Sequence, residues 1–200
     1  MAKLDDWARR RGTVTMTPTS RLARYEALVE AYQRQVLAYA MRRSPTVDEA
    51  EDASAETFII AWRKLDDIPI DASLPWLYAV ARRVLANHRR GRTRRERLSA
   101  RLRIEDVATP LRLGEGTDGP ALTVLASLSP SDQELLRLVA WEELDHGAIA
   151  QVLGITPNAV AIRLHRVRGR FVAALKGSSM SRTSMVVKGT HGVAREGASE

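Results

Sequence analysis

The chain has 200 residues, and its 31 Lys and Arg against 24 Asp and Glu give a net charge of +7 at neutral pH. This excess indicates an anionic partner, and Arg, which supplies 27 of the 31 bases, suits bidentate contacts with phosphate. The absence of Cys excludes disulfides and thiolate-held zinc. No apolar run approaches the ~20 residues of a membrane span, and the N-terminal MAKLDDWARRR lacks a secretion signal's apolar core. We therefore expect a cytoplasmic protein without membrane insertion.

The charge is divided among three segments of the chain. Residues 45–67 carry seven acids and two bases, a net charge of −5. Residues 82–103 carry ten arginines and one acid, a net charge of +9, and residues 156–176 carry five bases and no acid. Two basic surfaces predict contacts with nucleic acid, whereas the acidic one indicates a second, basic partner.

The first half of the chain predicts a mobile arm followed by three helices. Residues 1–18 are polar and form the arm, and apolar residues recur at helical spacing from Thr19 to about Ala40. Thr46 with Glu49 three residues later is a capping box that opens a second helix, ending near residue 64. After a loop, Ser73 is expected to cap a third helix that reaches about residue 98. We expect residues 19–98 to form the first domain.

The second half predicts a linker, a smaller domain and a tail. Residues 99–119 lose periodicity and include the Gly-rich LGEGTDG, which indicates a linker. Helical patterning resumes in residues 120–176, where Ser129 or Ser131 is expected to cap a helix. The Gly- and Ser-rich residues 177–200 are expected to be disordered. Because no strand pattern occurs, we predict an all-α fold of two small helical domains joined by a flexible linker.

The strongest local pattern is a helix-turn-helix in residues 144–171. Asp145 can cap its first helix, Gly154 makes the turn, Thr156 caps the second helix, and Pro157 takes the first helical position. One arc of the second helix is apolar, and the other could enter a DNA major groove. The residues of this other arc are Asn158, Ala161, Ile162, Arg163, His165, Arg166 and Arg170. The alternative is an ordinary helical hairpin with a solvated basic face.

The other two patterns lie on the first domain's helices. The third helix carries a basic face with nearby aromatic residues, which favours binding of single-stranded DNA or RNA unless the aromatic side chains belong to the core. Its residues are Trp76, Tyr78, Arg82, Arg83, Asn87, His88, Arg89 and Arg90. On the second helix, Asp48, Asp52 and Glu56 share a face, where like charges cost about 0.2–0.5 kcal/mol per pair. A basic protein surface would relieve this repulsion, although a solvated acidic face is the simpler alternative.

Together these stretches resemble the extracytoplasmic-function (ECF) sigma factors of bacterial RNA polymerase. The resemblance lies in DEAEDASAETFIIAW (48–62), LPWLYAVARRVLANHRR (74–90) and the stretch 128–171, in that order. It departs at three places: Arg82-Arg83 stands where the family usually has Arg-Asn, Ala55 where Gln is common, and Ala161-Ile162 where polar residues are usual. The last pair would favour apolar contact with a thymine methyl group.

The resemblance implies three partners and three sites. RNA polymerase core would bind the acidic helix at Asp48, Glu49, Asp52 and Glu56. Promoter DNA would be melted at its −10 element by the 66–74 loop and the basic helix, at Trp76, Arg82, Arg83, Asn87, Arg89 and Arg90. The −35 element would be read by the helix from Thr156 to Arg170. An anti-sigma factor would be the third partner.

Three alternatives lie outside this family. An autonomous helix-turn-helix regulator would explain residues 144–171 but leave the acidic helix and the arginine run without a role. A hydrolase or metal enzyme would need clustered ligands or a nucleophile–base pair, and His88, His146, His165 and His191 are scattered. An RNA-binding protein is the third alternative, but the sequence shows no recognisable RNA-binding module. We therefore expect no catalytic residues, no metal and no cofactor, and the protein is not expected to be an enzyme.

Overall fold

The computed structural model of the chain describes residues 18–102 and 119–189, with side chains placed at 20–97 and 119–177. All its long elements are α-helices, and these described residues contain no strand, which confirms the all-α prediction. The helices are α2 (Pro18–Met41), α3 (Val47–Arg63), α4 (Ser73–Leu102), α5 (Pro120–Ser127), α6 (Pro130–Ala140), α7 (His146–Leu153) and α8 (Pro157–Gly189). Two 3₁₀ turns, η1 (Leu65–Asp67) and η2 (Ile70–Ala72), join α3 to α4.

The contacts divide the chain into two units. The first comprises residues 1–113 and 144–157 and holds α2, α3, α4 and α7; the second comprises residues 114–143 and 158–200 and holds α5, α6 and α8. We placed α7 in the second domain, but it packs against α4 and is grouped with the first unit. Most of the predicted arm (1–18) and of the predicted linker (99–119) lies outside the described residues; Pro18 already belongs to α2, and residues 99–102 continue α4.

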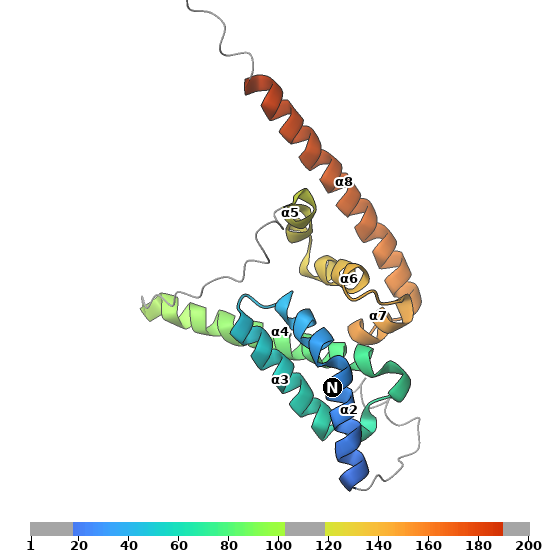
Figure 1. Cartoon of the computed structure of the whole chain (residues 1–200). Helices are drawn as coiled ribbons and strands as arrows, with labels where there is room; N and C mark the ends of the chain where they lie inside the picture. Colours follow the sequence, from blue (N-terminus) through green and yellow to red (C-terminus); the bar gives the residue numbers. More distant parts are fainter. Residues whose placement is uncertain (1–17, 103–118, 190–200) are drawn as a thin grey trace, which may run out of the picture. The chain divides into compact units, whose positions relative to one another are not determined.

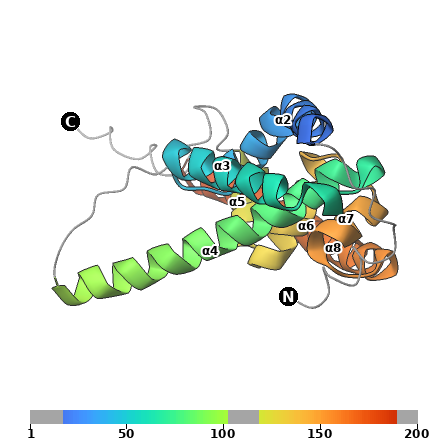
Figure 2. The ribbon, with the colours of Figure 1, turned by 90° about the horizontal axis from the view of Figure 1, so that it is seen from below.

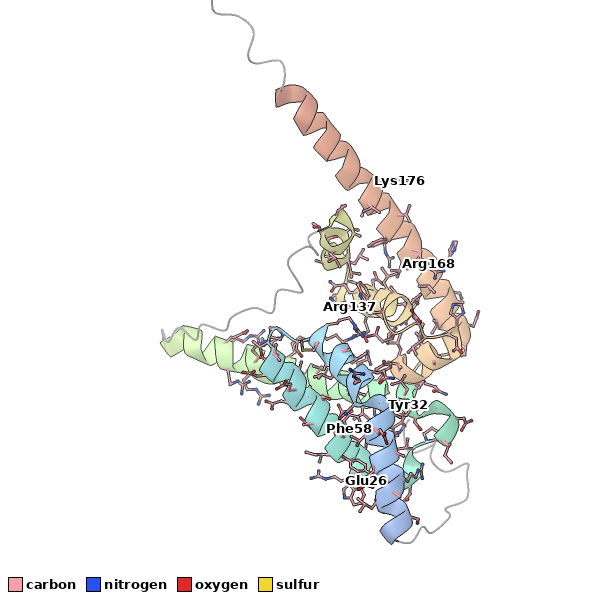
Figure 3. All side chains as sticks on the ribbon, viewed as in Figure 1. Glu26, Tyr32, Phe58, Arg137, Arg168 and Lys176 are labelled. Atoms are coloured by element: carbon pink, nitrogen blue, oxygen red, sulfur yellow. The ribbon has the colours of Figure 1, made fainter. Side chains whose placement is uncertain are left out.

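In the first unit, α2, α3 and α4 pack on one another, as Figure 1 shows. The apolar sides of these helices supply the core, in which Tyr39 of α2 and Tyr78 of α4 stack with ring centroids 4.7 Å apart. Phe58 of α3, which Figure 3 labels, is buried in the same unit. The core of the second unit consists of Val124 and Leu125 from α5, Leu135 and Leu138 from α6, and Val160, Leu164 and Val167 from α8. Burial of these side chains fixes which faces of α4 and α8 remain exposed.

Several predicted helix starts are confirmed by side-chain caps. The Thr46 hydroxyl accepts from the Glu49 N–H at 3.2 Å and opens α3, and the Asp145 carboxylate accepts from the Ala148 N–H at 2.7 Å and opens α7. Between the two candidates for α6, Ser129 is the cap, accepting from the Asp132 N–H. Each cap pairs a backbone donor that the helix itself leaves without a partner.

Two predictions about helix ends are wrong. Ser73 does not cap α4: η2 runs directly into the helix, Ser73 is already helical, and its hydroxyl donates to the Pro69 and Ile70 carbonyls. Residues 177–189, which we expected to be disordered, continue α8 to Gly189. After Gly177 the sequence contains no Pro, and one glycine costs a helix only about 1 kcal/mol. The remaining tail residues, 190–200, lie outside the described chain.

Candidate functional site

The acidic residues of α3 fall into two groups according to their exposure. Asp48 and Asp52 are exposed, whereas Glu49 and Glu56 are half-buried on the side of the helix that packs against α4. At 100° per residue, Asp48 and Asp52 share their exposed strip with Ile59, whose side chain is 50% exposed. This strip, residues 48, 52 and 59, is hereafter the acidic strip. It presents two carboxylates and one apolar side chain to solvent.

The two glutamates bind basic residues of α4 across the helix interface. The Arg92 guanidinium donates to Glu49 at 2.5 Å, and His88 Nε2 lies 2.9 Å from a Glu56 oxygen. The order of these contacts along the two helices is reversed, as antiparallel packing requires. Of the four predicted polymerase-docking residues, two are therefore engaged inside the protein, and two belong to the acidic strip.

The carboxyl end of α3 is held by contacts with α2. The Arg21 guanidinium donates to Asp66 at 2.5 Å and to the Trp62 carbonyl at 2.9 Å, and it lies 5.3 Å from the Trp62 ring centroid. The Tyr25 ring meets Trp62 edge to face at 5.1 Å, and burial raises the pKa of the Tyr25 hydroxyl. These contacts fix the direction in which α3 presents its acidic strip.

The predicted −10 residues of α4 are exposed, with one exception. Arg82, Arg83, Asn87, Arg89 and Arg90 all reach solvent, and Arg90 donates to the Asn87 amide oxygen at 2.5 Å. Partial burial, and then the neighbouring Arg82 charge, lower the pKa of the Arg83 guanidinium. The face is thus a dense set of guanidinium groups that an anion would stabilise.

The exception is Trp76, whose side chain lies in the core with only 7% of its surface exposed. Tyr78, which we also considered for this face, is 3% exposed, so the alternative that both aromatic residues belong to the core is confirmed. A base cannot stack on either ring while it is buried. The apolar side chain that does face solvent here is Ile70 in η2, which is 83% exposed.

Ile70 is presented by a loop whose backbone is tied to neighbouring side chains. Arg24 of α2 donates to the Ile68 carbonyl at 2.6 Å, and the Ser73 hydroxyl donates to the Pro69 carbonyl at 2.7 Å. These bonds pair the loop carbonyls, which explains how an exposed turn keeps a defined shape.

The turn after α7 has the geometry that a helix-turn-helix requires. Gly154 adopts φ 68° and ψ 37°, a left-handed conformation in which a side chain would be strained. Its N–H and that of Ile155 both bond to the Ala150 carbonyl and so close the end of α7. The chain then enters α8 at Pro157, whose missing N–H costs nothing in the first helical turn.

The predicted −35 residues lie on the solvent side of α8 and at its start. Val160, Leu164 and Val167 are buried, which leaves the opposite arc open to solvent. Its exposed members are Thr156, Asn158, Ile162, Arg163, His165, Arg166 and Arg170, and Ala161 is half-buried among them. Figure 3 labels two further exposed basic residues of this helix, Arg168 between Arg166 and Arg170, and Lys176 beyond them.

One member of this set, Arg170, is bound inside the second unit. Its guanidinium donates to the Asp132 carboxylate on α6 at 2.6 Å. The sequence offered no indication of this pair, nor of Glu49–Arg92 and Glu56–His88, because the partners are 32 to 43 residues apart.

Among the placed side chains, no three His, Asp or Glu come together in a way that could hold a metal ion. No single helix of the described ranges combines the length and apolar character that a membrane crossing needs.

Two sequence-family models match the chain. Sigma-70 region 2 matches residues 28–95, which span most of α2 to α4, and sigma-70 region 4 matches residues 119–171, from the start of α5 into α8. The acidic strip and the arginines of α4 fall in the first match. The exposed arc of α8 falls in the second.

Individual proteins with similar sequences and folds are also sigma factors. The chain is 27% identical to the RNA polymerase sigma factor NccH of Alcaligenes xylosoxydans xylosoxydans, over 76% of this chain and 87% of that protein. It is 28% identical to the ECF RNA polymerase sigma factor SigC of Mycobacterium tuberculosis, over 74% and 81% of the two chains. Among solved structures, it resembles the sigma factor RpoE of Bartonella quintana, crystallised with the anti-sigma factor NepR. That likeness has a TM-score of 0.59 at 25% identity and covers 76% of this chain and 96% of that one.

Proposed function

The chain belongs to the ECF sigma factors of the sigma-70 family, and we propose that three of its exposed surfaces divide the work of initiating transcription. As a sigma factor it directs RNA polymerase core to promoters. The observation that supports a division of labour is the separation of charge: one acidic strip on α3 and two basic faces, on α4 and α8.

The acidic strip is the surface proposed to bind the polymerase. Asp48 and Asp52 are exposed four residues apart, and neither has an ion pair among the described residues. Their repulsion would be relieved by a basic surface on the partner, and Ile59 adds apolar area beside them. Glu49 and Glu56, which we predicted as docking residues, are proposed instead to hold α4 in place through Arg92 and His88.

The basic faces are proposed to bind the two promoter elements. The α4 arginines would hold the melted −10 strand by its phosphates, and the exposed Ile70 would touch its bases in place of the buried Trp76. The arc of α8 would enter the major groove at −35. Contacts with duplex DNA at −35 would set the register before melting begins at −10.

Membership of this family also suggests a further partner and the cellular location. An anti-sigma factor is a further proposed partner, as NepR is for the Bartonella quintana protein. The protein is proposed to act in the cytoplasm, where bacterial RNA polymerase works, and to leave all bond-making chemistry to that enzyme.

The deciding experiment adds the purified protein to core polymerase and a mixed promoter library, then sequences the transcripts. We expect new initiation sites that share a −35 and a −10 element. A protein that binds duplex DNA tightly by itself and gives core polymerase no new start sites would instead be an autonomous regulator, and the proposal would fail.

The docking assignment is tested by reversing two charges, Asp48→Lys with Asp52→Lys. We expect binding to core polymerase to weaken about 100-fold or more, because like charges brought together at an interface cost several kcal/mol. The matched control is Glu26→Lys with Glu30→Lys, an exposed acidic pair at the same spacing on α2. Equal loss from both variants, measured by fluorescence anisotropy, would show a general charge effect and not a docking strip.

A further inference from the structure

The loop between α3 and α4 places two isoleucines in opposite surroundings. Ile68 belongs to the core and is 3% exposed, whereas Ile70, two residues later, is 83% exposed. Pro69 stands between them with φ −71° and ψ 138°, and its ring restricts φ to about −65°. The first isoleucine therefore anchors the loop, and the second is presented to solvent at a fixed distance from that anchor.

Side chains bind three successive carbonyls of this loop. The Arg24 guanidinium donates to the Ile68 carbonyl at 2.6 Å. The Ser73 hydroxyl lies 2.7 Å from the Pro69 carbonyl oxygen and 3.2 Å from that of Ile70. Carbonyls paired in this way hold the backbone of the loop in one conformation. Because Arg24 belongs to α2 and Ser73 to α4, the loop is supported from two helices.

The support from α2 comes from its first turns. This helix lies beside α3, as Figure 1 and Figure 2 show. Arg21 donates to the Trp62 carbonyl at 2.9 Å, and the Tyr25 hydroxyl donates to the Phe58 carbonyl at 3.3 Å. Since the later residue of α2 meets the earlier residue of α3, the two helices are antiparallel. The start of α2 therefore meets the end of α3 and the loop that follows, where Arg21 also binds Asp66.

The residues that make these contacts precede the matched part of α2. The match to sigma-70 region 2 begins at residue 28, whereas Arg21, Arg24 and Tyr25 stand three to seven residues before it. The support of the loop by α2 is thus made by residues of this chain that lie outside that match.

We propose that Arg24 is a positioning residue for recognition of the −10 element, because it holds the loop in the conformation that presents Ile70 to an unpaired base. A loop that is already ordered loses less conformational freedom on binding, so the contact is stronger. This inference rests on the proposed function, which assigns the contact with bases to Ile70. It adds that the first turns of α2, which touch no base themselves, determine how well that contact is made.

The test uses the full-length protein bound to core polymerase and a fluorescent single-stranded −10 oligonucleotide, whose sequence comes from the start sites found with the promoter library. The variants are Arg24→Gln, Ile70→Ala and the two combined. The matched control is Arg34→Gln, which removes an exposed arginine from the same helix. Anisotropy gives the affinity between about 50 and 300 mM KCl. Binding to core polymerase, measured separately, verifies that each variant is folded.

We expect Arg24→Gln to weaken binding to the oligonucleotide about 2- to 12-fold, the cost of ordering one side chain on binding. The log–log salt slope should not change, whereas loss of a direct phosphate contact would reduce it by about 0.7. Ile70→Ala should weaken binding about tenfold, through lost apolar contact. In that background Arg24→Gln should have no further effect, because no side chain remains to be positioned. Arg34→Gln should match the wild-type protein.

A second substitution covers the case in which Arg24→Gln does not fold. Arg24→Lys keeps the charge and the apolar stem but replaces the planar guanidinium by a single ammonium group. Its loss of affinity should be smaller than that of Arg24→Gln and should also be absent when Ile70 is replaced by Ala.

Three results would overturn the inference. Wild-type affinity in Arg24→Gln would exclude a positioning role, and an equal loss in the Ile70→Ala background would show that Arg24 acts elsewhere. A reduced salt slope would make Arg24 a phosphate ligand. If Ile70→Ala itself binds like the wild-type protein, the base contact of the proposed function has failed, and this inference falls with it.

Discussion

The two basic helices, α4 and α8, both expose arginines, but they differ in the residues beside those arginines and in what holds the opposite side of the helix. On α4 the exposed side consists mostly of guanidinium groups, with one amide at Asn87, and the opposite side is fastened to α3 by Glu49–Arg92 and Glu56–His88. On α8 the opposite side is apolar and buried, while the exposed arc mixes arginines with Asn158, Ala161 and Ile162.

The difference indicates what each helix can read. Guanidinium groups that meet only phosphates position a protein on DNA without distinguishing sequences, whereas an arginine that reaches a guanine edge reads that base. Amide and methyl groups placed among arginines can contact base edges, since Asn pairs with adenine and apolar groups contact the thymine methyl. From this comparison we propose that α8 discriminates between sequences and that α4 mainly holds the DNA backbone.

The largest effect expected from this comparison is a difference between two double variants. Arg163→Ala with Arg166→Ala should lower affinity for the preferred −35 sequence about 10- to 100-fold, because each base contact contributes about 1–3 kcal/mol, and should leave binding to a scrambled −35 less affected. Arg82→Ala with Arg83→Ala should weaken binding to both promoters by the same factor and flatten the salt slope. Anisotropy on the two promoters measures both, and a uniform loss from the α8 variant would break the comparison.

A smaller effect is expected at Ile162, which is 46% exposed in the middle of the α8 arc. Ile162→Thr should lower affinity about fivefold, near 1 kcal/mol, at a single −35 position and broaden the preference there. Ile162→Val keeps an apolar group and serves as control. Selection from a randomised −35 library gives the preference of each variant, and identical profiles would remove Ile162 from base recognition.

Much of the fold was predictable because its signals are local. Thr46, Asp145 and Gly154 each act within four residues, so a cap or turn read from the sequence reappears in the structure. The cap predicted at Ser73 was wrong because a hydroxyl near the start of a helix can also donate to preceding carbonyls, as Ser73 does to those of Pro69 and Ile70. The end of α8 was missed because Gly177 resembles a stop signal and is only a weak one.

The candidate site was predictable as charged faces but not as individual roles. Whether a carboxylate on α3 meets solvent or α4 depends on how two helices pack, and the acidic pattern alone grouped Glu56 with Asp48 and Asp52. Trp76 presented the same problem, since an aromatic side chain on a half-apolar helix can either pack in the core or stack on an unpaired base. Only packing separates these alternatives, and it buries Trp76 and pairs Glu56.

The smallest effect is expected where α4 is fastened to α3. Glu49→Gln and Glu56→Gln should each lower the free energy of unfolding by about 0.2–1 kcal/mol, since both pairs are partly exposed and screened by solvent. Asp52→Asn removes the same charge from the exposed side of α3 and should not lower stability; relief of its repulsion with Asp48 should raise it by about 0.2–0.5 kcal/mol. Urea unfolding, with a double-mutant cycle of Glu49→Gln and Arg92→Gln, isolates the coupling between the partners. A coupling energy of zero would mean that the ion pair does not hold α4, and the orientation of the exposed arginines of α4 would then depend on the apolar core alone.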